Sequence, residues 1–172
     1  MKIRKNSGFS LIELIVVVAI MGVMMGVVGF SISMIARTNV KKTAQMVRTG
    51  IEATRVNAMS RVGESSVRFY VNGEKGTIDM EVTEGGSREI REIGYVNTVT
   101  IRCSTAETPG DDDWTDIADM VNAEGKKGLI ITFDRSTGAF KGEMIPKKIE
   151  ISGGTKKFTI TCYQLTGKSV ME

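Results

Sequence analysis

The chain contains no histidine, two cysteines, two prolines and one tryptophan among its 172 residues. Histidine is the most common general base and metal ligand in proteins, so its absence excludes a Ser–His or Cys–His catalytic pair. No phosphate-binding glycine motif follows an expected strand, and no metal-ligand spacing occurs. The sequence therefore does not point to an enzyme, and it predicts no cofactor and no metal.

An excess of charge of one sign is also missing. The formal net charge is +3, but three of the 23 basic residues, Lys2, Arg4 and Lys5, lie within the first eight positions. Without these three, 20 basic residues face 20 acidic ones. The global charge of the remaining chain therefore gives no argument for binding to nucleic acid.

The most prominent feature is an apolar run of 27 residues, Phe9 to Ile35, that contains one charge, Glu13. About 20 apolar residues suffice to span a bilayer, and the preceding basic residues favour a cytoplasmic N-terminus. A secretory signal peptide has a shorter apolar run, with its small-residue cleavage site after the run. A plain membrane anchor fits the length but leaves Glu13 unexplained, because a carboxylate in a membrane-spanning helix costs about 2.5–3.5 kcal/mol.

The segment Gly8-Phe9-Ser10-Leu11-Ile12-Glu13 follows a short basic segment. The two segments together resemble the leader and processing site of type IV prepilins and type II secretion pseudopilins. The resemblance implies that a prepilin peptidase cleaves between Gly8 and Phe9 and methylates the new terminal amine of Phe9. It also implies that Glu13 meets the terminal amine of a neighbouring subunit. The implied partners are the peptidase, other pilin or pseudopilin subunits, the inner-membrane assembly platform and membrane lipid.

On this interpretation, the chain has a leader (1–8), a transmembrane polymerisation helix (9–35), an amphipathic helix (36–61) and a β-rich domain (62–172). The protein would cross the inner membrane once, with its C-terminal domain outside the cytoplasm, and would then enter a pilus or pseudopilus. Gly22, Gly26 and Gly29 are candidates for close helix packing, because small residues let helices approach each other. Glycine is also simply common in membrane helices, so both interpretations remain open.

After residue 36 the periodicity predicts an α+β fold. Apolar or small residues recur at spacings of three and four along the second helical segment, which gives one buried helix face: Val40, Ala44, Val47, Ile51, Thr54 and Ala58. Beyond residue 62 the period is two, with expected strands around 67–71, 78–82, 99–103, 129–133, 139–144, 149–151 and 158–162. About seven mostly antiparallel strands need a cover for their apolar face, and the amphipathic helix is the expected cover.

Short matches extend the resemblance toward a subgroup, the H-type minor pseudopilins and FimT-like minor pilins. They are residues 51–61 followed directly by a strand, the turn at 133–138, and residues 163–168. Some FimT-like proteins bind DNA through a basic tail, but residues 167–172 contain a single lysine, so that activity is not implied.

Two further features leave alternatives open. Cys103 and Cys162 both occupy the inward phase of their strands, which suits either a disulfide or two buried thiols. The acidic stretch Asp111–Asp113 suits either a calcium-binding loop or a solvated loop, and its spacing is not that of an EF-hand.

The sequence thus predicts a structural, minor subunit of a pilus or pseudopilus. The alternative is a membrane-tethered or pilus-borne binding module for adhesion or DNA uptake.

Overall fold

The computed structural model describes residues 10–60, 63–122, 125–142 and 144–172, with the side chains of residues 26–38 left outside the description. The chain divides into two compact units, Met1–Ile35 and Ala36–Glu172. The principal helix, α1, spans Leu11–Ser60 and contributes residues to both units. A helix over residues 9–61 was expected, and the described part of that range is helical from Leu11 to Ser60.

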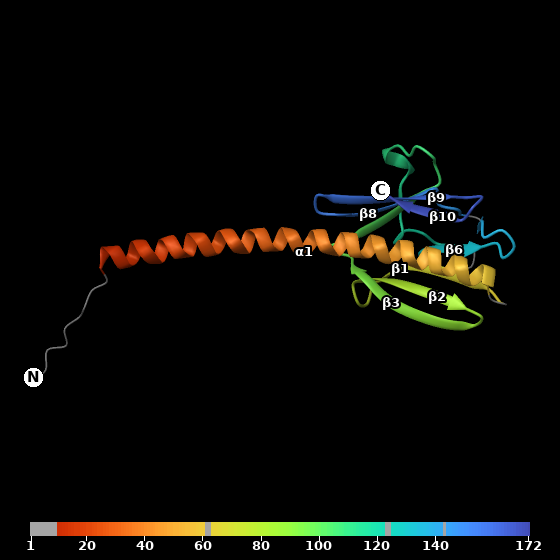
Figure 1. Cartoon of the computed structure of the whole chain (residues 1–172), viewed down its shortest axis with the longest axis horizontal. Helices are drawn as coiled ribbons and strands as arrows, with labels where there is room; N and C mark the ends of the chain where they lie inside the picture. The colour runs from red at the N-terminus through yellow and green to blue at the C-terminus, as the bar shows by residue number, and fades with distance from the viewer. Residues whose placement is uncertain (1–9, 61–62, 123–124, 143) are drawn as a thin grey trace, which may run out of the picture. The chain divides into compact units, whose positions relative to one another are not determined.

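The described part of the second unit contains two antiparallel five-stranded sheets (Figure 1). The first sheet has the order β3-β2-β1-β6-β7, and its strands are β1 (Ser65–Asn72), β2 (Thr77–Glu84), β3 (Ser87–Tyr95), β6 (Leu129–Phe133) and β7 (Phe140–Lys141). The second has the order β10-β9-β8-β4-β5, and its strands are β4 (Thr100–Ser104), β5 (Thr115–Asp116), β8 (Lys148–Gly153), β9 (Lys156–Tyr163) and β10 (Lys168–Met171). A short 3-10 helix, η1 (Asp111–Asp113), precedes β5.

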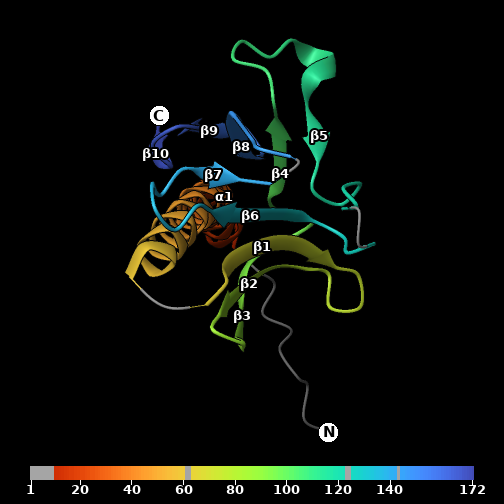
Figure 2. The ribbon, with the colours of Figure 1, turned by 90° about the vertical axis from the view of Figure 1, so that its right-hand side faces the viewer.

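The C-terminal part of α1 lies between the two sheets (Figures 1 and 2). Toward the first sheet, the Thr43 hydroxyl donates a hydrogen bond of 2.6 Å to the carbonyl oxygen of Ile93. Toward the second sheet, Val40 packs so close to Gly153 that an added Cβ would lie 2.7 Å from its side chain. Because one helix serves as the inner partner of both sheets, it connects them into a single core.

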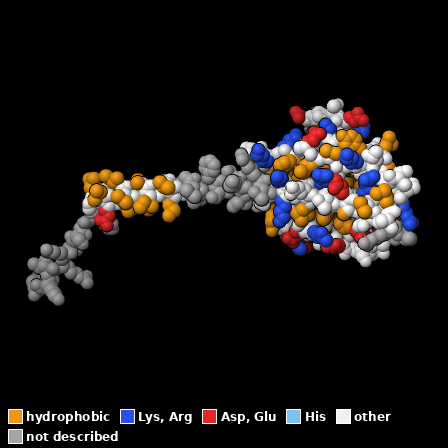
Figure 3. Space-filling model, in the orientation of Figure 1, with side chains coloured by type: hydrophobic (Ala, Val, Ile, Leu, Met, Phe, Trp, Pro, Cys, Tyr) orange, Lys and Arg blue, Asp and Glu red, His pale blue; other side chains and the backbone are white. Residues whose placement is uncertain are grey.

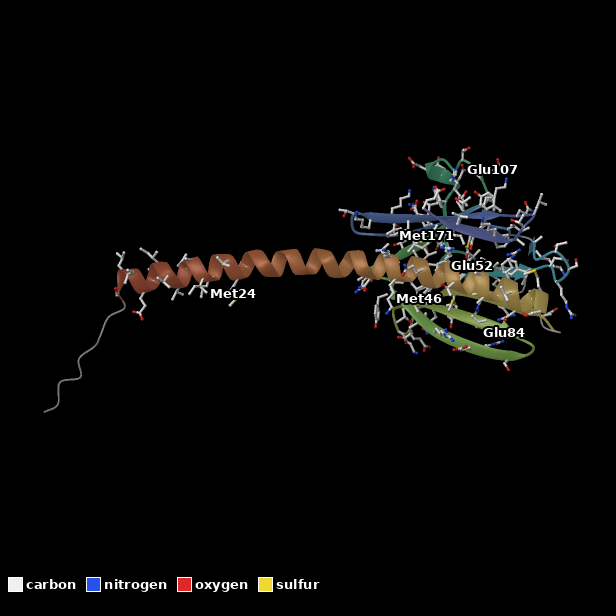
Figure 4. The ribbon with its side chains drawn as sticks, viewed as in Figure 1. Met24, Met46, Glu52, Glu84, Glu107 and Met171 are labelled. Carbon is white, nitrogen blue, oxygen red and sulfur yellow. The ribbon has the colours of Figure 1, made fainter. Side chains whose placement is uncertain are left out.

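The buried face of α1 is the one that the periodicity predicts. The expected positions are all buried, at 0% to 4% exposure: Val40, Ala44, Val47, Ile51, Thr54 and Ala58. They meet inward residues of the first sheet, such as Phe69 and Ile78, and of the second, such as Ile149 and Ile160. Met46 on α1 and Met171 on β10 pack against this core and remain partly exposed (Figure 4).

The strands differ from expectation in several places. The strands expected at 67–71 and 78–82 are confirmed as β1 and β2, which pair antiparallel in the register Phe69↔Met80. The strand expected next, at 99–103, exists as β4 but belongs to the second sheet. The strands β3, β5 and β10 were not expected, and the strand expected at 139–144 is reduced to β7, Phe140–Lys141.

The physical reason is clearest for β3. Residues 87–92 are all exposed, so charged side chains occupy both faces and the alternation that marks a half-buried strand is absent. The strand is held by backbone pairing to β2, from Glu84↔Ser87 onwards. The two turn residues Gly85 and Gly86 have φ values of 53° and 91°, which suits a two-residue hairpin turn of the kind that glycine favours.

Candidate functional site

The candidate assembly site is built on the first turn of α1. The helix begins at Leu11, and the Leu14 N–H donates a hydrogen bond of 3.2 Å to the carbonyl oxygen of Ser10. Glu13 lies in this first turn and is exposed. A carboxylate in the first turn is favoured by the positive end of the helix dipole. The predicted cleavage and methylation residues, Gly8 and Phe9, lie outside the described residues.

The segment of α1 that follows has apolar side chains on every face. Each large apolar side chain between Leu11 and Met25 is exposed, from 40% at Val17 to 77% at Leu11. Figure 3 shows these side chains along the visible face of the segment, and Figure 4 shows the side chain of Met24 projecting from the helix. A helix that is apolar all round requires an apolar environment, either lipid or other helices.

Within the part of the chain that the structure describes, no helix is both long enough and apolar enough to cross a membrane. The expected span, residues 9–35, includes Phe9 and the side chains of residues 26–35, which lie outside the described residues.

The three glycines expected to mediate helix packing all lie in α1. A Cβ added to Gly22 would meet nothing within 4 Å, so the backbone there is accessible to a neighbouring helix. The surroundings of Gly26 and Gly29 lie outside the description. Their packing role therefore stays a prediction.

The two cysteines are free, buried thiols in the structure, so the disulfide considered from the sequence is not formed. The strand order explains why. Cys103 lies on β4 and Cys162 on β9, and β8 runs between these strands. Two strand spacings amount to about 9.6 Å, whereas the Cα atoms of a disulfide lie within about 7 Å of each other. Burial raises the pKa of each thiol to about 12, which keeps both thiols protonated and unreactive at neutral pH.

The acidic stretch around Asp111 forms the exposed helix η1, where the Asp113 carboxylate accepts a hydrogen bond of 2.8 Å from the Gly110 N–H. Among the described residues, no group of three or more His, Cys, Asp or Glu side chains is arranged to hold a metal ion.

One charged cluster of the second sheet was not expected from the sequence. Glu150 on β8 is 1% exposed and forms ion pairs with Arg102 on β4 and Lys157 on β9. Burial alone would raise the pKa of Glu150, but the hydrogen bonds from Lys157 and Arg102 outweigh it and hold the pKa below the usual value. Both cations lie near the ring of Trp114, at 5.9 Å and 5.7 Å from its centroid. Arg102 lies 48 positions before Glu150, and Lys157 lies seven positions after it. Only the order of the strands in the sheet could therefore have revealed the cluster.

Comparison with known proteins gives one match. Residues 3–29 match the model of a prokaryotic N-terminal methylation motif. No curated protein and no solved structure matched the chain. The match covers the segment that contains Gly8, Phe9, Glu13 and the exposed apolar residues of α1, and it does not extend into the β-rich unit. The N-terminal segment thus carries the methylation motif that is typical of prepilin-type proteins, and this match supports the prediction of a type IV pilin or type II secretion pseudopilin.

Proposed function

We propose that the protein is a structural, minor subunit of a type IV pilus or type II secretion pseudopilus, with a type IV pilin-like fold. The observation that carries the proposal is the helical segment from Leu11 to Met25, which is apolar and exposed on every face and contains a single carboxylate, Glu13. Such a surface requires lipid before assembly and sister helices after it. The same helix then serves first as anchor and later as polymerisation element.

Processing prepares the site. A prepilin peptidase removes residues 1–8, and the amine of Phe9 is methylated while the apolar segment of residues 9–35 resides in the inner membrane. The β-rich unit lies outside the cytoplasm. The assembly platform then adds the subunit to the growing filament through contacts between the N-terminal helices of neighbouring subunits.

Glu13 supplies the directional contact in this mechanism. Its carboxylate pairs with the terminal ammonium of a neighbouring subunit. At about 4 Å such a pair contributes about 1 kcal/mol in water and about 4 kcal/mol in partly buried surroundings. The pairing is therefore weak for an exposed subunit and strong inside a bundle of apolar helices, so it favours correct docking.

The test is the substitution Glu13→Ala, with filament yield and total membrane level measured side by side. Removing a costly charge should leave the membrane level unchanged or raised, while incorporation into sheared filaments should fall at least tenfold, since 1.4 kcal/mol corresponds to a factor of ten. The matched control is Glu52→Ala. Glu52 is another glutamate of α1, partly exposed and paired with Arg48 at 3.0 Å within the second unit, and its loss should change neither quantity.

Unchanged incorporation of Glu13→Ala would contradict charge pairing at the docking step. Such a result fits a simple anchor or an outermost subunit, and labelling of the filament tip separates these two. Electron microscopy of cells that lack the protein tests the alternative function. Intact filaments with lost adhesion or DNA uptake would favour a binding module over a structural subunit.

A further inference from the structure

The four edge strands of the two described sheets are very unequal in length. Three are short: β7 and β5 have two residues each, and β10 has four. The fourth, β3, has nine residues and forms the free margin of the first sheet (Figure 2). Short edge strands offer little backbone for pairing, whereas a long exposed edge is a template for another strand. The edge formed by β3 is therefore the one edge in the described sheets with room for a partner strand.

The backbone of β3 is presented at this margin in a definite way. The residues that flank a two-residue hairpin loop exchange hydrogen bonds, and such pairs alternate along an antiparallel ladder. Counting from the Glu84↔Ser87 pair, the backbone groups of Arg88, Ile90 and Glu92 point away from β2. These three residues are exposed, with Ile90 at 54%.

The side chains of β3 are complementary to a second copy of the same strand. The central segment reads Arg88-Glu89-Ile90-Arg91-Glu92. When two copies run antiparallel with Ile90 opposite Ile90, each Arg88 faces a Glu92 and each Glu89 faces an Arg91. Opposite charges directly across an antiparallel pair stabilise it, and like charges destabilise it.

Other registers lack this match. A shift that centres the pairing on Glu89 or Arg91 places two identical charges opposite each other. A register centred between residues 89 and 90 places Arg88 opposite Arg91. A register centred between residues 90 and 91 places Glu89 opposite Glu92. A parallel, in-register pair places every charge beside its own kind. One antiparallel register is therefore strongly preferred.

The charges of β3 are available for such an exchange. Glu89 and Arg91 pair with each other at 2.7 Å, and both side chains are about 60% exposed. Glu92 pairs with Lys75 at 3.4 Å, and both side chains are exposed. Arg88 is 62% exposed and pairs at 2.9 Å with the buried carboxylate of Glu81, which also pairs with Arg68. Exposed ion pairs are weak, so re-pairing of Glu89, Arg91 and Glu92 costs little, and Glu81 keeps Arg68 as its partner when Arg88 re-pairs.

We propose that two copies of this chain associate through β3, antiparallel and centred on Ile90, which joins their first sheets into one continuous sheet. The contact is isologous, because the same patch serves both partners. Pairing of a single strand buries less surface than a standard stable interface, so the dimer is weak. A two-fold contact of this kind does not repeat along a polar filament, so it is separate from contacts of the N-terminal helix and does not rest on the proposed function.

Charge reversal in the full-length chain, purified in detergent, tests the pairing by sedimentation equilibrium. Glu89→Arg or Arg91→Glu alone sets two like-charged pairs across the boundary and should weaken self-association roughly tenfold or more. A one-to-one mixture of the two variants restores opposite charges and should recover the wild-type association. The matched control is Glu52→Arg, which disrupts a partly exposed ion pair on α1 and should leave association unchanged.

Cysteine cross-linking tests the register. Directly opposite, hydrogen-bonded residues have Cα atoms about 5.5 Å apart, which suits a disulfide. Ile90→Cys should therefore form a disulfide-linked dimer on mild oxidation. Ser87→Cys is the control, because the two copies of position 87 lie six residues apart along the ladder, about 20 Å, and should not cross-link. Equal cross-linking at both positions, lack of rescue in the mixture, or a wild-type chain without concentration-dependent association would each overturn the proposal.

Discussion

The substitution Ile51→Ala tests whether α1 is part of the folded core of the β-rich unit. Ile51 is fully buried in the helix segment that lies between the two sheets. The substitution removes three carbon atoms, which at about 0.8 kcal/mol each corresponds to about 2.4 kcal/mol of lost transfer free energy. The cavity left behind adds to this, and the full cost of such substitutions is about 2–5 kcal/mol. Because a domain is stable by only about 5–15 kcal/mol, the loss is large.

The assay is urea unfolding of a fragment that starts at residue 37, which contains every core residue in the described part of the second unit. Tryptophan fluorescence and circular dichroism follow the transition. The midpoint should fall while the slope with denaturant stays constant, which identifies a change in stability alone. The matched control is Val56→Ala, since Val56 lies on the same helix and is 55% exposed. Its effect should stay within about 0.5 kcal/mol.

A loss below about 1 kcal/mol for Ile51→Ala would refute the reasoning. So would a fragment of residues 63–172 that unfolds cooperatively without the helix. Removal of the helix should instead expose the inner faces of both sheets and cause aggregation.

Three further predictions concern processing, the thiols and one turn. In a host with active prepilin peptidase, intact-mass analysis should show loss of residues 1–8 and one methyl group on Phe9; recovery of only the full-length chain would contradict this. At pH 8 the thiols of Cys103 and Cys162 should react with maleimide at least a hundredfold more slowly in the native protein than in denaturant, because burial raises their pKa to about 12, and without reductant both should label after unfolding. Asp134 accepts hydrogen bonds of 2.6–3.0 Å from Ser136 and Thr137, which lower its pKa to about 2. A depressed pKa stabilises the fold above the unfolded value of about 3.8 and loses that effect as pH falls toward 2. Asp134→Ala should therefore lower the urea midpoint at pH 7 and have little effect at pH 2; an equal loss at both pH values would show that the carboxylate charge is irrelevant.

Several features followed from local sequence alone. The spacing of Val40, Ala44, Val47 and Ile51 gave the buried face of α1, because a helix brings positions three and four apart onto one side. The alternation of apolar and polar residues at 67–71 and 78–82 predicted the strands β1 and β2, because successive side chains of a strand point to opposite faces of the sheet. The methylation motif is a contiguous stretch, so its recognition needed no tertiary information.

Tertiary structure decided which strands became neighbours. Periodicity indicates which side chains face inward, but backbone hydrogen bonds between strands are chemically alike and do not specify the partner. The division into two sheets, the pairing of charged β3 and the position of β8 between Cys103 and Cys162 therefore emerged only in the folded unit. The same holds for the Glu150 cluster, whose cations come from the strands on either side of β8. Residues distant in sequence met there because the sheet order, set by packing on α1, brought their strands together.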